Sequence, residues 1–200
     1  MFLPLEKRIL KFEGKIDDDT KFSYSSFLGN PTNAIRQNKL GLPFPKEKIY
    51  KIIQGYNGGF SHNNEYNRFA IDFNLKVNDT ICSADDGIIV GIIQDYKFGG
   101  NTQIWRDNDR SNFITIYHPH SGLYTQYSHL IHSGSFVKIG EEVKKGQPIG
   151  LSGMTGFTDT PHLHFNVLIP KKGGTFVSIP IDFTNNIKGE DLKKDKKIKH

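Results

Sequence analysis

The segment 161–165, Pro-His-Leu-His-Phe, places two histidines two residues apart in an apolar stretch. Side chains alternate along a β-strand, so in a strand His162 and His164 point to one face while Leu163 and Phe165 point to the other. Two imidazoles on a common face have no packing purpose, and they make sense when they converge on one site. A His-x-His pair is only moderately specific for a metal, so its interpretation depends on partners elsewhere in the chain.

Asp72 is the carboxylate that best matches this pair. A hydrolytic zinc site requires three protein ligands and an open position for water, and imidazole and carboxylate are its usual ligands. Asp72 lies between Ile71 and Phe73 in a strand-like stretch, where a carboxylate is rarely found without a partner. His62 lies earlier, on a glycine-containing loop that leads into this stretch. A single loop histidine is more often a surface residue than a ligand, so its interpretation as a ligand depends on the combination.

The remaining histidines divide into one candidate and four weaker ones. His129 follows two tyrosines near the end of an expected strand, where it is either a satisfied rim residue or an acid or base beside the metal. His118 and His120 form a second His-x-His pair, but a proline separates them at an expected turn, where ligands would be poorly held. We expect His132 to be exposed to solvent, and His200 lies in the C-terminal tail.

Short strands separated by turns surround these positions. The apolar run 87–93 predicts a buried strand, and the segments 111–118 and 122–130 predict a hairpin. A further strand is expected over 162–169, and no helical periodicity is present over 60–170. We therefore predict one all-β domain over residues 41–185.

The two ends of the chain differ from this domain in composition. Residues 1–40 carry little periodic signal and predict an irregular N-terminal arm of unknown role. From Lys188 to His200 there are six lysines and three acidic residues, a local charge of +3, within a formal net charge of +5 for the whole chain. A basic run of this kind is typical of a solvated, disordered tail, and we predict one over 186–200.

Overall composition excludes several other classes of protein. The 200 residues have a hydrophobic content of 36% and a mean hydropathy of −0.48, and no apolar run approaches the roughly 20 residues that a membrane span requires. No basic stripe with interleaved aromatic residues indicates nucleic-acid binding. The single cysteine, Cys82, is expected to be buried and cannot form an internal disulfide. No signal peptide is visible at the start, which fits either a cytoplasmic protein or one whose leader has been removed.

The order of the motifs resembles the lysostaphin/LytM-like zinc peptidases, which are peptidoglycan endopeptidases. The motifs are Phe-Ser-His at 60–62, the Asp72 strand at 66–75, Tyr-Ser-His-Leu at 127–130, the glycine-rich block 137–156 and Pro-His-Leu-His-Phe at 161–165. The resemblance covers about residues 40–170, and the late glycine-rich block with its Thr-Gly pair is its most specific part.

The resemblance implies a zinc-dependent endopeptidase that uses a metal-activated water on peptide cross-links or stem peptides of peptidoglycan. It implies Zn²⁺ as the cofactor, with His62, Asp72 and His164 as its ligands, and it places His129 and His162 beside the metal-bound water. The implied fold is a compact, mostly antiparallel β-domain with an open groove. Such a substrate implies a periplasmic or secreted location.

The chain departs from the commonest pattern of this family at two places. The position four before Asp72 is Arg68, where the best-known members have histidine, so the first ligand falls on His62 in a form with a longer loop. The usual Pro-x-Gly-Thr turn after the aspartate is replaced by residues 76–80, in which Asn78 and Asp79 can serve the same turn.

Three alternatives to this interpretation remain. A non-catalytic peptidoglycan-binding regulatory module on the same fold would lack one or more ligands, whereas every expected ligand type is present here. A lipoyl- or biotinyl-type carrier would need an acceptor lysine at a hairpin tip, which residues 151–156 do not offer. A cupin-type oxygenase would need a glutamate shortly after His120 or His164, and none follows. The bond cleaved, the oligomeric state and the choice of base between His129 and His162 are not indicated.

Overall fold

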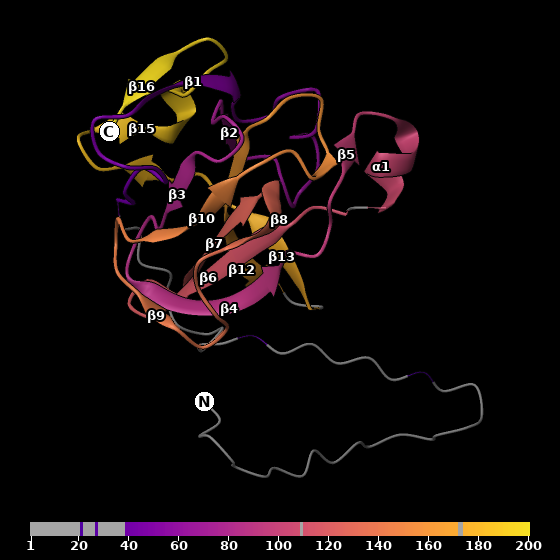
Figure 1. Cartoon of the computed structure of the whole chain (residues 1–200). Coiled ribbons are helices and arrows are strands. Elements are labelled where there is room, and N and C mark those ends of the chain that lie inside the picture. Colours follow the sequence, from indigo (N-terminus) through magenta and orange to yellow (C-terminus); the bar gives the residue numbers. More distant parts are fainter. Residues whose placement is uncertain (1–20, 22–26, 28–38, 109, 172–173) are drawn as a thin grey trace.

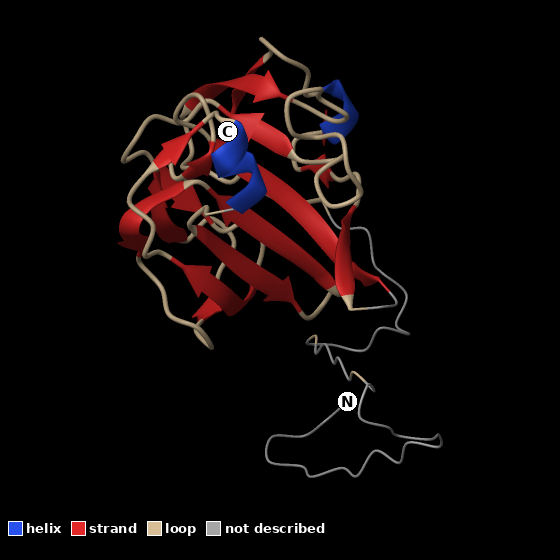
Figure 2. Cartoon of the chain, turned by 90° about the vertical axis from the view of Figure 1, so that its right-hand side faces the viewer, coloured by secondary structure: helices blue, strands red, loops and turns tan. Residues whose placement is uncertain are grey.

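The fold is all-β and mostly antiparallel, as the sequence predicts. The structure is a computed structural model that describes Lys21, Phe27 and residues 39–108, 110–171 and 174–200. Strands account for 44% of the described residues and helices for 6%, and strands fill the body of the molecule in Figure 2. The predicted N-terminal arm, 1–40, lies almost entirely outside the described residues.

The largest sheet has the strand order β16-β1-β2-β12-β7-β6-β4-β9, and β13 pairs with the far end of β12. All of its pairings are antiparallel. Its strands are β1 (Ile49–Gln54), β2 (Ile71–Phe73), β4 (Gly87–Ile93), β6 (Phe113–His118), β7 (Leu123–Ser128), β9 (Glu142–Val143), β12 (Leu163–Lys171), β13 (Thr175–Ser178) and β16 (Lys197–Lys199).

Three smaller sheets complete the described structure. A three-stranded sheet has the order β3-β10-β8, β5 pairs in parallel with β11, and β14 pairs with β15. Figure 1 shows β5 and the short helix α1 projecting from one side of the body. These elements are β3 (Thr80–Cys82), β5 (Gly99–Gly100), α1 (Gln103–Asn108), β8 (Leu130–Ser135), β10 (Pro148–Ser152), β11 (Gly156–Phe157), β14 (Asp182–Phe183), β15 (Ile187–Lys188) and the 3-10 helix η1 (Gly189–Asp191). None of the helices in the described part of the chain is long and apolar enough to cross a membrane.

The core forms between the large sheet and the three-stranded sheet. Leu163, Phe165 and Val167 alternate along β12 and are almost fully buried, as the sequence pattern predicts. They belong to one apolar cluster with Ile81 of β3 and Ile149 of β10. Burying this common apolar surface holds the two sheets together and fixes the face of β12 that carries the histidines.

The predicted hairpin is present, but two strand predictions require correction. β6 and β7 pair from Phe113 to His118, which confirms the hairpin. The run 87–93 is a strand, yet only Gly87 and Ile89 are buried and its other residues are partly exposed. The predicted strand 122–130 breaks at His129, whose φ of 67° lies in the left-handed region, and the chain passes there from the large sheet to β8.

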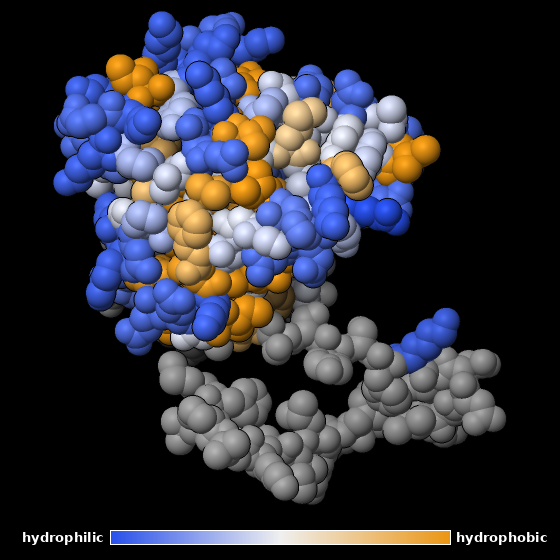
Figure 3. Space-filling view, viewed as in Figure 1, coloured by the Kyte–Doolittle hydropathy of each residue, from blue (hydrophilic) through white to orange (hydrophobic). Residues whose placement is uncertain are grey.

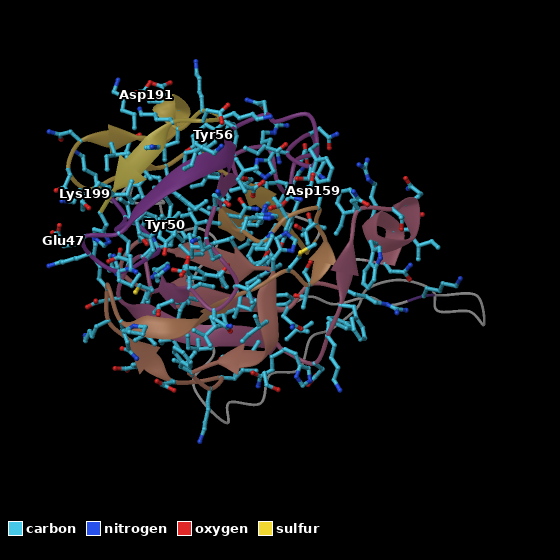
Figure 4. All side chains as sticks on the ribbon, turned by 45° about the horizontal axis from the view of Figure 1, so that its top comes forward. Glu47, Tyr50, Tyr56, Asp159, Asp191 and Lys199 are labelled. Carbon is cyan, nitrogen blue, oxygen red and sulfur yellow. The ribbon has the colours of Figure 1, made fainter. Side chains whose placement is uncertain are left out.

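The prediction of a disordered tail over 186–200 is wrong, because this segment is folded onto the body. β16 pairs with β1, and the C-terminus lies beside these strands in Figure 1. Leu192 and Ile198 insert into the core cluster, while the lysines around them point outward and make this region predominantly hydrophilic in Figure 3. Figure 4 shows Lys199 beside Glu47, with a nitrogen–oxygen distance of 2.8 Å. Alternation of lysine with a few apolar residues is therefore a strand pattern here.

Replacing Leu192 with alanine tests this folded tail. We expect Leu192→Ala to lower the free energy of unfolding by about 2–5 kcal/mol, because it removes a side chain buried in the core. Urea unfolding followed by circular dichroism measures the change, with the exposed Lys197→Ala as the matched control. An unchanged midpoint in Leu192→Ala would restore the prediction of a disordered tail.

Candidate active site

The site is built where β2 meets β12. The register of these two antiparallel strands places Asp72 directly opposite His164. Directly paired residues bring their side chains within about 5 Å on one face, so this pairing alone unites a carboxylate with an imidazole. The loop between β1 and β2 folds back over the same point and buries His62 completely.

His62, Asp72 and His164 meet through one atom each. The Nε2 atom of His62 lies 3.2 Å from Asp72 Oδ1 and 3.2 Å from His164 Nδ1, and His164 Nδ1 lies 2.9 Å from Asp72 Oδ1. Ligands about 2.0–2.1 Å from a tetrahedral zinc ion stand about 3.3 Å apart. The three atoms are therefore spaced as three ligands of one small metal ion, and they are the described group suited to holding one.

Backbone and amide oxygens fix the orientation of the two ligand imidazoles. His62 Nδ1 donates to the carbonyl oxygen of Gly55 at 2.9 Å, and His164 Nε2 donates to Asn67 Oδ1 at 3.3 Å. Each ring then directs its other nitrogen toward the other ring and toward Asp72. Burial lowers the pKa of His62, but the Asp72 carboxylate outweighs burial and raises that pKa, whereas in the neutral rings these nitrogens carry lone pairs. Lone pairs held this close to a carboxylate repel one another, and a bound cation relieves that repulsion, so the donor set fits a metal.

Gln54, which the sequence analysis did not single out, holds the second oxygen of Asp72. Its Nε2 donates to Asp72 Oδ2 at 3.1 Å and to Ser61 Oγ at 2.9 Å, while its Oε1 accepts from the backbone N–H of Phe60 at 3.0 Å. The same side chain thus ties the His62 loop to β2 and leaves Asp72 Oδ1 for the centre. Nothing in the sequence distinguishes Gln54 from any other polar residue at the end of a strand.

His129 and His162 lie beside this group, with ring centroids 4.5 Å apart. His129 Nδ1 donates to the carbonyl oxygen of Thr155 at 2.7 Å, and His162 Nδ1 donates to that of Thr160 at 2.8 Å. Each ring therefore keeps its Nε2 as a free acceptor, and His162 Nε2 lies 3.7 Å from Asp72 Oδ1. The sequence highlights Thr155 through its Thr-Gly motif, but it carries no signal for the carbonyl of Thr160.

Burial and mutual charge set the protonation of the site. Burial, together with the neighbouring His162 and His164, holds the pKa of His129 well below its usual value, so this imidazole is neutral at neutral pH. Burial also raises the pKa of Asp72, but the adjacent His162 and His62 outweigh it and hold that pKa well below its usual range. The centre therefore offers a carboxylate and a neutral general-base candidate.

The centre lies where two hollows of the surface meet to form a groove. One hollow has a volume of about 400 Å³ and is bordered by His164, and the other has a volume of about 530 Å³ and is bordered by Asp72 and His162. Phe60 and His129 line both hollows. An extended chain lying in this groove would cross the centre, as the predicted open groove requires.

The rival pair His118 and His120 does not form a metal site. His118 is fully buried, and its ring nitrogens bond the carbonyl oxygen of Asp86 and the hydroxyl of Thr125, both at 2.8 Å. His120 is exposed and lies 2.9 Å from an Asp85 carboxylate oxygen. Because both nitrogens of His118 are used and the two rings face different surroundings, the low weight that the sequence assigns to this pair is correct.

Three further residues that the sequence analysis discounted are His132, Cys82 and His200. His132 is exposed and Cys82 is buried, as predicted. His200, which the sequence assigns to a disordered tail, bonds the carbonyl oxygen of Phe44 through its Nδ1 and helps to anchor the C-terminus.

Comparison with known proteins identifies the family. The model of peptidase family M23 matches residues 66–177, a range that includes Asp72, His129, His162 and His164, while His62 lies just before it. An uncharacterized metalloprotease of Buchnera aphidicola subsp. Baizongia pistaciae is 34% identical over 176 residues, which cover 82% of this chain and 41% of that protein. The peptidoglycan DD-endopeptidase ShyA of Vibrio cholerae is 32% identical over 98 residues, which cover 49% of this chain and 19% of ShyA.

A solved structure shares the fold over a larger part of its own length. The deep-sea M23 metalloprotease pseudoalterin superposes with a TM-score of 0.52 at 17% identity, covering 82% of this chain and 93% of that chain. This likeness shows the fold alone, and the chain spans less than half the length of the two relatives compared by sequence. The resemblance drawn from the motifs is confirmed, because the family match extends over more than half of the chain: it belongs to peptidase family M23, a family of metallopeptidases.

Proposed function

We propose that this chain is a zinc-dependent endopeptidase that hydrolyses peptide bonds in the cross-links or stem peptides of bacterial peptidoglycan. The observation that carries the proposal is the meeting of His62, Asp72 and His164 through single atoms 2.9–3.2 Å apart. ShyA, a relative named as a peptidoglycan endopeptidase, supports the choice of substrate.

The donor set favours zinc over magnesium and calcium. Two imidazole nitrogens and one carboxylate oxygen are a ligand set that zinc accepts in hydrolases, whereas magnesium and calcium prefer oxygen alone. When bound, zinc supplies a Lewis acid that polarises the scissile carbonyl and lowers the pKa of a bound water from 15.7 toward about 7. His62, Asp72 and His164 are the residues that would hold it.

His129 and His162 supply the proton transfers in this proposal. Both rings are held through Nδ1–H by backbone carbonyls, so both direct Nε2 to the groove. One of them, neutral at Nε2, takes the proton of the attacking water and delivers it to the leaving amine, and the other, protonated at Nε2, donates a hydrogen bond to the developing oxyanion. General acid–base catalysis of this kind contributes typically about 10²–10⁴-fold in rate. A peptidoglycan substrate places this activity in the periplasm or outside the cell.

Substitution of the ligands should separate metal binding from catalysis. We expect His62→Ala and His164→Ala to lose zinc and activity together, because each removes one of three ligands. His129→Ala should retain one zinc ion per chain and lose about 10²–10⁴-fold in rate. Metal content by atomic emission, measured beside kcat/KM, distinguishes the two outcomes.

Arg68→Ala is the matched control for His62, because Arg68 occupies the position of the usual family ligand and its side chain is exposed. It should keep both zinc and activity. Full zinc content in His62→Ala would show that His62 is not a ligand, and full activity in His129→Ala would exclude its catalytic role.

Digestion of purified peptidoglycan identifies the bond. We expect mass spectrometry to find new peptide termini after incubation with the protein, none after EDTA treatment, and their return on addition of zinc. His164→Ala provides a control that lacks a complete ligand set. Intact peptidoglycan together with stoichiometric zinc would refute the choice of substrate, and absence of zinc would favour the regulatory module.

A further inference from the structure

Arg106 lines one hollow of the groove and belongs to the helix α1, which projects from one side of the body in Figure 1. Its guanidinium carbon lies 4.6 Å from the ring centroid of Phe157, over the ring face. Its Nη2 approaches the carbonyl oxygen of Phe60 at 3.5 Å, and the rings of Phe60 and Phe157 are stacked with centroids 4.8 Å apart. The aromatic pair therefore orients the guanidinium at the mouth of the hollow that contains His164.

Arg106 is the single permanently charged side chain among the residues that line this hollow. The other lining groups are hydroxyls, amides, aromatic rings and the two site histidines, His129 and His164. The opposite hollow differs, because Lys193 and Lys194 line it together with the acidic Asp159 and Glu190. The two hollows are thus two arms of the groove, one on each side of the centre. The arm that contains Arg106 carries only positive charge, and the opposite arm carries charges of both signs.

Arg106 has no carboxylate partner among the ion pairs of the described residues. The adjacent Asp107 is engaged elsewhere, since its Oδ1 accepts a hydrogen bond from Gln103 Nε2 at 2.7 Å. A guanidinium carries five N–H donors in a fixed plane, and its contact with an aromatic face leaves the donors at the edge available. The charge of Arg106 is therefore free to meet an anionic group that enters the groove.

We propose that Arg106 binds a free carboxylate of the substrate in this arm, and that the enzyme selects peptides bearing an acidic group on that side of the scissile bond. The inference rests on the proposed function, since it assigns a substrate class to the same groove. Planar carboxylates match the fork of a guanidinium with two parallel hydrogen bonds, which a carboxamide cannot reproduce. Because the pair is partly exposed, its contribution is expected to be about tenfold in affinity and to shrink as salt increases.

The test is a double-mutant cycle between Arg106 and the substrate. Cross-linked stem-peptide dimers, in which each free carboxylate is converted in turn into a carboxamide, are bound to zinc-loaded His129→Ala protein and measured by calorimetry. One amidation should weaken binding about tenfold, and the same amidation should have no effect when Arg106→Gln is also present. Lys138→Gln, an exposed change of equal charge outside both hollows, is the matched control and should preserve the full effect.

Hydrolysis by the protein with His129 intact is measured with the same dimers. An amidation effect that survives Arg106→Gln, or the absence of any amidation effect, overturns the role of Arg106 even if every dimer is cleaved. Binding that depends on both Arg106 and one carboxylate, without cleavage of any dimer, supports the carboxylate site and refutes the proposed function instead. Arg106→Lys, which keeps the charge and loses the planar fork, should give an intermediate coupling.

Discussion

The pairing of Asp72 with His164 across β2 and β12 is the constraint on which the site depends. Both residues are almost fully buried, and an ionised carboxylate in such a place is costly unless it is paired. The imidazoles of His62 and His164 and the amide of Gln54 are the partners of the Asp72 carboxylate. The register of β2 and β12 alone places His164 beside Asp72, so no loop is needed to position it. A shift of one residue in this register would turn His164 into the core and bring Leu163 to the site. The packing of β12 against the core opposes such a shift and so keeps His164 at the site.

The orientation of His62 depends on a segment that lies beyond the family-matched region. Its Nδ1 is held by the carbonyl of Gly55, and the backbone of Leu192 packs so closely on Gly55 that no side chain would fit there. Tyr56, beside Gly55, exchanges hydrogen bonds with the backbone of Ile181. The folded C-terminal segment therefore supports the loop that carries the first ligand, which links the stability of the tail to the geometry of the centre.

His129 illustrates how a local conformation serves the site. A left-handed φ is uncommon for any residue that has a side chain, and such conformations persist where surrounding contacts impose them. Here the bond from Nδ1 to Thr155 and the change from one sheet to another impose it. The result is an imidazole at the junction of the two hollows, where it faces a substrate from either arm.

The sequence by itself determined the all-β class, the hairpin, and the alternation of Leu163, Phe165 and Val167 into the core, because period-two patterning is a local property. It also marked Asp72 and the His162–His164 pair as site candidates, because their placement among apolar residues is chemically unusual. Only the tertiary structure decided that His118 is a packing residue, that Gln54 and the carbonyl of Gly55 orient the ligands, and that the basic tail is folded. The bonds of Gln54 and Gly55 join segments that only packing brings together, and the tail folds because Leu192 and Ile198 reach a core that its own composition does not reveal. The charge asymmetry of the groove likewise depends on which loops surround the centre, a property of long-range contacts that no local pattern encodes.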